Sequence, residues 1–186
     1  MPPKNIISKE KIIEKAFEVL RKEGFDAITA RRVAKELGIS TMPIYCHFKS
    51  IEELKEILLK KAHELLLTYQ LKNYTGESFL DTGIGYIKFA LEERVLFREC
   101  FMKRQSGSEF VERATGAEII KVMKKVEYLK ELDEKQLEEI LFRLWIFTFG
   151  LAALVNTGFI ENPSDEFIIK LLDEGGMAII EFEKNR

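Results

Sequence analysis

The chain has 186 residues, of which 46% are hydrophobic and 32% charged, with a formal net charge of −2, a composition ordinary for a soluble globular protein. Its two cysteines, Cys46 and Cys100, lie far apart, which argues against a disulfide framework and fits a reducing cytoplasm. The apolar run 144–155 has 12 residues where a membrane span needs about 20, so no membrane segment is expected. The first 15 residues show no apolar run followed by a small-residue cleavage site, so no signal peptide is expected.

Charge is distributed unevenly along the chain. Residues 1–50 contain ten Lys or Arg against six Asp or Glu, a net +4, which leaves −6 for residues 51–186. A basic first quarter on an acidic body favours contact between the N-terminal part alone and a polyanion. Chance asymmetry is the alternative, because the excess is modest.

The first predicted element is an amphipathic helix over residues 9–23. Ser8 can cap its start and Gly24 can end it. Its apolar stripe follows helical spacing and consists of Ile12, Ile13, Ala16, Phe17 and Leu20.

Two short helices follow. Thr29 can cap a helix over residues 30–37, and Gly38 can supply the left-handed backbone that a sharp turn needs. Ser40 can cap a third helix that ends near Phe48.

A long fourth helix opens at a predicted capping box formed by Ser50 and Glu53. No stretch shows the alternation of a strand, so we predict an all-α fold. Beyond a loop at 73–78, five further helices are expected near 79–93, 95–104, 108–130, 134–157 and 164–184.

Short helices around a glycine turn, with a third helix behind them, are the parts of a helix-turn-helix unit. Ile44 and Phe48 are spaced to hold the third helix on the first, and Lys49 with the start of the fourth helix can bind phosphate. Hydroxyls and an imidazole can bond bases or phosphates, and Met and Pro can contact a thymine methyl group. The face predicted to do so carries Ser40, Thr41, Met42, Pro43, Tyr45, Cys46 and His47.

The pair Cys46 and His47 is predicted to be neither a metal site nor a nucleophile and base. Neighbouring side chains on a helix diverge, and His63 is the only further histidine, so four zinc ligands are lacking. No cofactor or metal is therefore expected.

The N-terminal residues resemble the DNA-binding domain of TetR/AcrR-type transcriptional regulators. The resemblance rests on Gly24-Phe25, Ile28-Thr29, Val33-Ala34, Leu37-Gly38-Ile39-Ser40, Ile44-Tyr45, His47-Phe48, Ser50 and Glu53-Leu54. It implies an all-helical homodimer that binds a palindromic operator and releases it when a small molecule occupies the C-terminal domain.

The resemblance also implies roles for single residues. Thr41, Met42 and Pro43 would face bases. Apart from the resemblance, Arg31 or Arg32 could touch the DNA backbone, with solvated charge as the alternative. The chain departs from the family at Ile51, where Lys is frequent, and Lys49 or Lys55 could replace that contact. The remaining implied phosphate contacts are Thr29, Tyr45, His47 and Lys49. Packing on the first helix is the alternative for Tyr45, and a packed imidazole is the alternative for His47.

The acidic body is predicted to dimerise through its last two helices. Residues 140–155 are apolar on nearly every face, so this helix must be covered all round, and a second subunit could cover one side. Gly175 and Gly176 indicate close approach of another helix, with a kink as the alternative. The resemblance likewise implies an intersubunit four-helix bundle.

The resemblance further implies an effector pocket enclosed by the middle helices. Each aromatic or apolar candidate has plain core packing as its alternative reading. Their abundance favours an apolar or aromatic effector. The candidates are Tyr86, Phe89, Phe97, Phe101, Met123, Phe142, Trp145 and Phe149.

The sequence thus predicts a helix-turn-helix DNA-binding domain over 1–50 and a helical ligand-binding and dimerisation domain over 51–186. The predicted function is that of a cytoplasmic, non-enzymatic transcriptional regulator, a repressor released from double-stranded operator DNA by a small effector. A helical protein-interaction module and an enzyme with an unrecognised site remain the alternatives.

Overall fold

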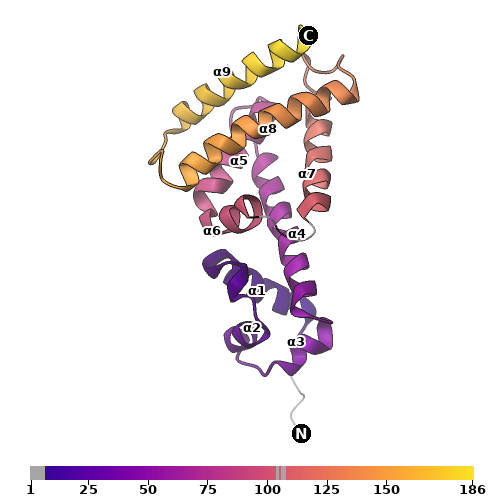
Figure 1. Ribbon diagram of the computed structural model, residues 1–186, viewed down its shortest axis with the longest axis vertical. Helices are drawn as coiled ribbons and strands as arrows, with labels where there is room; N and C mark the ends of the chain where they lie inside the picture. The colour runs from indigo at the N-terminus through magenta and orange to yellow at the C-terminus, as the bar shows by residue number, and fades with distance from the viewer. Residues whose placement is uncertain (1–6, 104, 106–107) are drawn as a thin grey trace. The chain divides into compact units, whose positions relative to one another are not determined.

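The computed structural model describes residues 7–103, 105 and 108–186, and the secondary structure of these residues is helical throughout, which confirms the all-α prediction. Figure 1 shows the elements in chain order. They are α1 (Lys9–Glu23), η1 (Phe25–Ala27), α2 (Ala30–Leu37), α3 (Met42–His47), α4 (Ile51–Gln70), α5 (Ser78–Glu92), α6 (Arg94–Phe97), the π-helical η2 (Arg98–Met102), α7 (Ser108–Met123), α8 (Glu134–Asn156) and α9 (Asp165–Lys184).

Packing divides the chain into two compact units. One comprises Met1–Ala62 with Val95–Ser108, and the other His63–Arg94 with Glu109–Arg186. The boundary therefore falls within α4. The predicted boundary at residue 50 is a different one, because it divides a DNA-binding domain from a ligand-binding and dimerisation domain. That functional division stays a prediction.

In the first unit, the predicted caps of the first two helices are present. Ser8 Oγ accepts a hydrogen bond from Lys11 N at 3.2 Å, and Thr29 Oγ1 accepts one from Arg32 N at 3.1 Å. These bonds satisfy amides that have no partner within the helix. The core between the helices consists of buried Ile12, Ala16, Leu20, Ile28, Val33, Ile44 and Phe48.

The turn before α3 differs from the prediction in one detail. The capping residue is Thr41 rather than Ser40, and its side chain makes no capping bond. Thr41 already has helical dihedral angles, and its carbonyl accepts from Ile44 N at 3.1 Å, so the first turn closes one residue later than expected. Pro43 lies in that turn, where an amide hydrogen is not needed.

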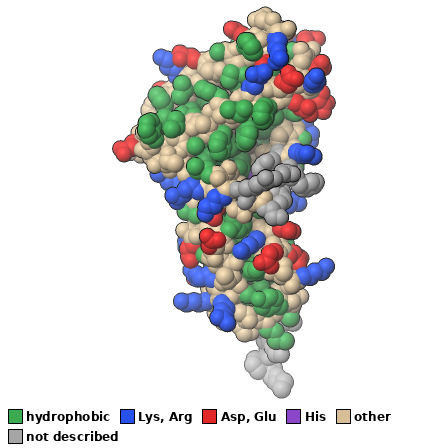
Figure 2. All heavy atoms as spheres, viewed as in Figure 1, with side chains coloured by type: hydrophobic (Ala, Val, Ile, Leu, Met, Phe, Trp, Pro, Cys, Tyr) green, Lys and Arg blue, Asp and Glu red, His purple; other side chains and the backbone are tan. Residues whose placement is uncertain are grey.

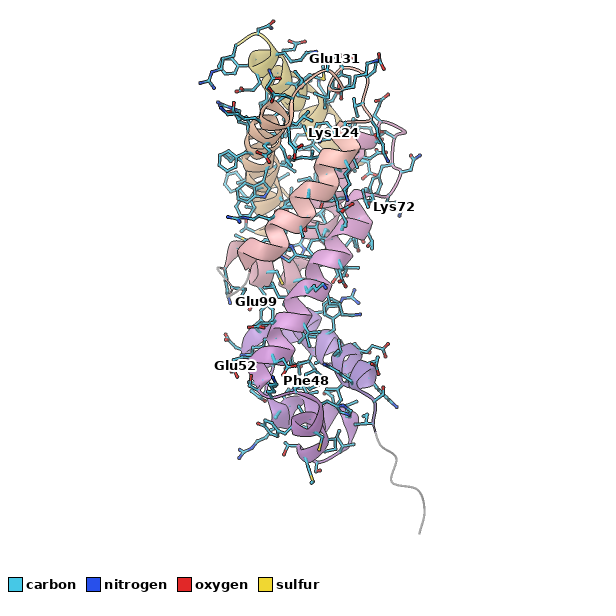
Figure 3. The ribbon with its side chains drawn as sticks, turned by 90° about the vertical axis from the view of Figure 1, so that its right-hand side faces the viewer. Phe48, Glu52, Lys72, Glu99, Lys124 and Glu131 are labelled. Carbon is cyan, nitrogen blue, oxygen red and sulfur yellow. The ribbon has the colours of Figure 1, made fainter. Side chains whose placement is uncertain are left out.

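Glu99 of η2 binds the turn after α1 within this unit. Its carboxylate accepts from Phe25 N at 3.2 Å and from Lys103 Nζ at 2.5 Å (Glu99 is labelled in Figure 3). A Cβ atom at Gly24, whose φ is +85°, would lie 2.9 Å from Glu99 Cδ. The positive φ favours glycine there, and an added Cβ atom would also displace the Glu99 carboxylate.

The second unit is built on mutual packing of α5, α8 and α9. Asn156 Nδ2, at the end of α8, donates to Ala90 O at 2.8 Å and to Arg94 O at 3.2 Å. Lys88 of α5 pairs with Asp165 at the start of α9 at 2.8 Å. These contacts join helices that are distant in sequence.

The predicted helix over 108–130 ends earlier, because α7 stops at Met123. Tighter turns follow, in which Val126 N donates to Met123 O at 3.0 Å and Leu129 N to Val126 O at 3.0 Å. This winding lets Leu129 enter the core. The buried cluster there consists of Met123, Leu129, Leu137, Ile140 and Ile180.

Gly175 and Gly176 lie where α9 approaches α8 of the same chain. A Cβ atom at Gly175 would lie within 2.8 Å of two carbon atoms of the Phe147 ring, and one at Gly176 would lie 3.7 Å from a methyl carbon of Leu144. The predicted close approach of another helix is confirmed. The approaching helix is α8 of the same chain.

Candidate nucleic-acid interface and ligand cavity

Helix α3 has one buried and one exposed face. Ile44 and Phe48 are 1% and 2% exposed, whereas Met42 and Tyr45 are 73% and 58% exposed. An exposed methionine and tyrosine on a six-residue helix are available for contact with another molecule, because the core holds the helix through other residues. Of the remaining predicted contact residues on this segment, Ser40, Cys46 and Lys49 are exposed, and Thr41, Pro43 and His47 are half-buried.

His47 also joins α3 to the segment before α1. Its Nε2 lies 2.9 Å from the carbonyl oxygen of Ile7. Because a carbonyl only accepts, Nε2 carries the proton in this contact and Nδ1 remains for a second partner. His47 therefore has a structural contact of its own, whatever else it binds.

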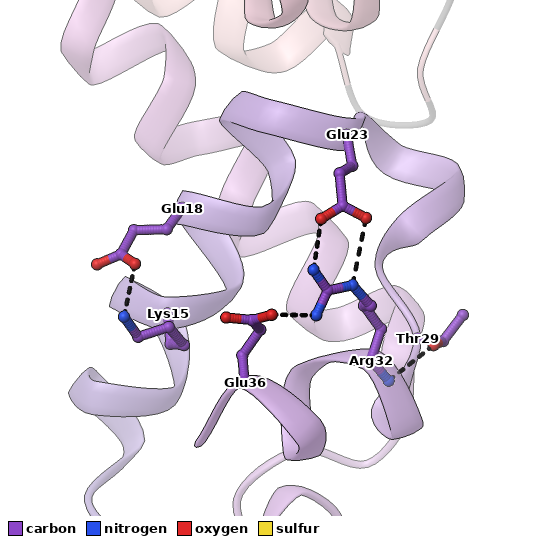
Figure 4. A network of polar contacts seen from close by, with 6 residues as sticks. All are labelled: Lys15, Glu18, Glu23, Thr29, Arg32 and Glu36. Carbon is purple, nitrogen blue, oxygen red and sulfur yellow. Dashed lines mark hydrogen bonds and ion pairs between the residues drawn. The ribbon is translucent and has the colours of Figure 1, made fainter. Parts of the chain in front are cut away.

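The two arginines at the start of α2 differ in their surroundings. Arg32 is bound by two carboxylates, with Nε donating to Glu23 at 3.2 Å and Nη1 bonding Glu36 (Figure 4). Hydrogen bonds from Arg32 lower the pKa of both glutamates. Arg31 is exposed and makes no ion pair with any described residue. Of these two arginines, Arg31 therefore has the side chain that is available to contact a DNA phosphate.

At the start of α4, backbone amides are bound by Ser50 and by the carboxylate of Glu53, a residue of the same helix. Ser50 Oγ accepts from Glu53 N at 3.2 Å, and the Glu53 carboxylate accepts from Lys49 N at 2.7 Å, one residue before the amide that a standard capping box uses. The Lys49 amide is thus engaged, and Lys49 offers its exposed ammonium group instead.

The second unit contains a cavity of about 100 Å³. Two of the eight predicted pocket residues, Tyr86 and Trp145, line it. The cavity lies among α4, α5, α7, α8 and α9. Its lining residues are Gln70, Phe79, Leu80, Thr82, Gly83, Tyr86, Ile119, Tyr128, Leu141, Leu144, Trp145, Phe147, Thr148, Leu172, Asp173, Gly176, Met177 and Ile180.

The other six predicted pocket residues lie elsewhere. Phe89 and Met123 are completely buried in the core of the second unit. Phe97 is also buried, and Phe101 stacks on it with ring centroids 5.7 Å apart. Phe142 and Phe149 flank Trp145 along α8, at 6.1 and 5.7 Å between ring centroids.

Gln70 and Asp173 line the cavity and were not singled out from the sequence. A signal existed for Gln70, since it continues the buried i, i+4 stripe of Leu58, Ala62 and Leu66 on α4. A polar residue at a buried register needs a partner or a function. No comparable pattern marks Asp173, which is exposed.

The two thiols have opposite surroundings. Cys46 is exposed, whereas Cys100 is buried, and burial raises the pKa of the Cys100 thiol to about 12. The described residues contain no group of three His, Cys, Asp or Glu side chains placed to hold a metal ion. Among the same residues, no helix has the length and apolarity of a transmembrane span.

A glycine turn between two short helices, the second exposed on one side and anchored on the other, places the first unit in the helix-turn-helix class of DNA-binding folds. The sequence model of the tetR family of bacterial regulatory proteins matches residues 12–56. Residues 12–56 of the chain therefore carry the sequence pattern of the tetR family.

Similar proteins cover different shares of the chain. The class D tetracycline repressor protein of Escherichia coli is 27% identical over 103 residues, which are 55% of this chain and 44% of that protein. The chain thus matches less than half the length of that relative. Two solved structures share the fold: a TetR variant from Acinetobacter baumannii AYE in complex with minocycline (18% identity, 97% of this chain and 98% of that chain, TM-score 0.62), and BioQ with its double-stranded DNA operator (17% identity, 92% and 99%, TM-score 0.59).

Proposed function

We propose that the protein is a DNA-binding transcriptional repressor that leaves a palindromic operator when a small molecule binds its second unit. The observation that carries the proposal is the division of α3 into a buried Ile44 and Phe48 side and an exposed Met42 and Tyr45 side. Such a helix can enter a major groove without disturbing the core that holds it. Its work on DNA would place the protein in the cytoplasm.

The contacts to DNA follow from side-chain chemistry and position. At the start of α3, Thr41 offers a hydroxyl to base edges, and Met42 and Pro43 offer apolar surface to thymine methyl groups. Ser40 lies beside them in the turn. Around this segment, the phosphates would be bound by Thr29, Arg31, Tyr45, His47 and Lys49.

Dimerisation is proposed through α8 and α9. Phe142, Trp145, Ile146 and Leu154 of α8 are 59%, 46%, 54% and 42% exposed, and Figure 2 shows hydrophobic side chains gathered over this region. Contiguous apolar surface of this kind marks an interaction site, and a second copy would cover it. A two-fold dimer would present two copies of α3 to half-sites about 34–36 Å apart.

Two observations support regulation by a ligand. The second unit has a cavity lined largely by apolar and aromatic side chains. The names of the relatives agree, since one is a tetracycline repressor and another was solved with minocycline, while BioQ was solved with operator DNA.

The test is binding to labelled DNA fragments from upstream of the protein's own coding sequence, measured by anisotropy over a series of salt concentrations. If Arg31 and Lys49 of each protomer neutralise phosphates, the logarithm of affinity falls against log salt with a slope of about −4. Lys49→Gln should make that slope shallower by about 2 for the dimer.

Two variants on α3 distinguish the loss of a DNA contact from the loss of folding stability. Tyr45→Ala removes an exposed side chain, so we expect weaker DNA binding with an unchanged melting temperature. Ile44→Ala empties a buried site and should cost about 2–5 kcal/mol of stability. Equal affinity for upstream and unrelated fragments, with no loss in Tyr45→Ala, would refute the repressor assignment.

A further inference from the structure

The cavity of the second unit is lined in part by Gln70, whose side-chain oxygen is buried without a partner. Gln70 is 8% exposed, and its Oε1 is fully buried and accepts no hydrogen bond from any described residue. A buried carbonyl oxygen that has lost its hydrogen bonds to water is destabilising. A bound molecule that supplies a donor would satisfy this oxygen once the Gln70 amide turns toward the cavity that the residue lines.

The backbone fixes the position of Gln70. It is the last residue of α4, and α5 crosses it at Gly85, where an added Cβ atom would lie 2.1 Å from Tyr69 O and 2.7 Å from Gln70 Cα. Because backbone meets backbone here, the end of α4 has little freedom to move. The backbone of Gln70 is therefore held beside the cavity by the packing of two helices.

The size and walls of the cavity limit what can enter. A dry cavity of about 150 Å³ accommodates a benzene ring, and the cavity here is about 100 Å³. Trp145 and Met177 are lining side chains that can shift to admit one ring or a short chain. A ligand of several fused rings would require the helices themselves to separate.

Charge at the cavity has one sign. Asp173 is the one ionised side chain among the described lining residues, which include no Lys or Arg. The pKa of Tyr128, which also lines the cavity, is raised by burial and further by the carboxylates of Glu77 and Asp173. Arg143 of α8 does not line the cavity and is paired with Glu183. A carboxylate or phosphate ligand would find no counter-charge among the described lining residues.

We propose that this cavity binds a small neutral or cationic molecule, one ring or short apolar chain that carries an amine or hydroxyl, and discriminates against anions. The polar group meets the Gln70 amide, and an ammonium group also gains from Asp173 at the exposed edge. Turning the amide of Gln70 by 180° would exchange its oxygen and nitrogen, so the preference against anions rests on the charges. Only the consequence for DNA release rests on the proposed function.

The experiment uses the single tryptophan of the chain, Trp145, as the reporter, because it lines the cavity. Full-length protein without DNA is titrated with 2-phenylethylamine, 2-phenylethanol and phenylacetate, which share a ring and differ in charge. We expect the amine to bind up to about fivefold more tightly than the alcohol and the acid to bind most weakly. Equal or tighter binding of phenylacetate overturns the proposal, as does unchanged fluorescence with all three at about 10 mM.

Three variants assign the preference to residues. Asp173→Asn should remove the advantage of the amine over the alcohol, whereas Glu174→Gln, a neighbouring exposed acid outside the cavity, should preserve it. Gln70→Leu should weaken the amine and the alcohol about threefold to tenfold and leave the non-polar probe ethylbenzene unaffected or tighter. If Asp173→Asn keeps the ranking, or Gln70→Leu weakens ethylbenzene equally, the assignment is wrong.

Anisotropy with operator DNA separates this inference from the proposed function. If the ranking holds at Trp145 but no probe weakens DNA binding, the cavity assignment stands and the effector role fails. If DNA binding is specific but the ranking is reversed, the repressor assignment stands and the ligand class fails.

Discussion

Replacing Gly85 by alanine tests the tightest helix contact of the second unit. The added Cβ atom would lie 2.1 Å from Tyr69 O, where ordinary contact begins at 3.4 Å. The end of α4 and α5 would therefore have to separate by about 1.3 Å, the difference between these distances. No flexible side chain can absorb this shift, because the obstructing atoms belong to the backbone.

The expected magnitude combines two opposing effects. Overpacking costs about 1–3 kcal/mol, with the upper end appropriate for backbone atoms. Alanine regains about 1 kcal/mol of helix propensity over glycine in the interior of α5. We therefore expect Gly85→Ala to lower the free energy of unfolding by about 2 kcal/mol and to weaken the probes that bind at Gln70.

Gly116→Ala in α7 is the matched control. Among the described residues its Cβ atom would meet only Leu141, at an ordinary 3.9 Å, so the propensity gain of up to about 1 kcal/mol should remain. Urea unfolding at a fixed protein concentration measures both variants, because association changes apparent stability. If Gly85→Ala is as stable as Gly116→Ala, the close approach of α4 and α5 is refuted.

Three further predictions concern association, pH and thiol reactivity. Ile146→Arg places a charge on the exposed apolar side of α8, so sedimentation should show monomers, and an unchanged dimer would move the interface elsewhere. Burial lowers the pKa of His63 to about 4, so on acidification from pH 6.5 towards 4 the unfolded chain takes up the proton first and stability falls by on the order of 2–3 kcal/mol. The decrease of the urea midpoint with falling pH should be lost in His63→Leu and kept in His47→Asn. If His63→Leu still shows this decrease, groups other than His63 cause it. At pH 8, a thiol reagent should modify Cys46 rapidly and Cys100 only after unfolding, and two fast thiols per chain would contradict the burial of Cys100.

The N-terminal unit could be predicted in detail because its signals are local. Ser8 and Thr29 cap the helices they were expected to cap, and the i, i+4 pair of Ile44 and Phe48 is buried as the helical period requires. The error at Ser40 is one residue, since either of two adjacent hydroxyl residues could begin α3 and the backbone turn decided in favour of Thr41.

The second unit was harder to predict because its decisive contacts join distant residues. Helix α7 ends at Met123, and Leu129 is buried in a cluster with Leu137 and Ile180. No local sequence pattern predicts this cluster, because its members are distant in sequence. Most predicted pocket aromatics were as apolar as the two that line the cavity. Facing a cavity or a neighbouring helix is decided by rotation of the helices about their axes.

The sequence by itself determined the helices, the glycine turn and the two faces of α3, because caps, turns and periodicity act within a few residues along the chain. Only the tertiary structure decided that Gly85 brings α4 against α5, that Gln70 ends there with a buried oxygen, and that Asp173 supplies the one charge at the cavity. These features depend on how separate helices pack, and packing joins residues whose separation in sequence carries no information about their distance in space.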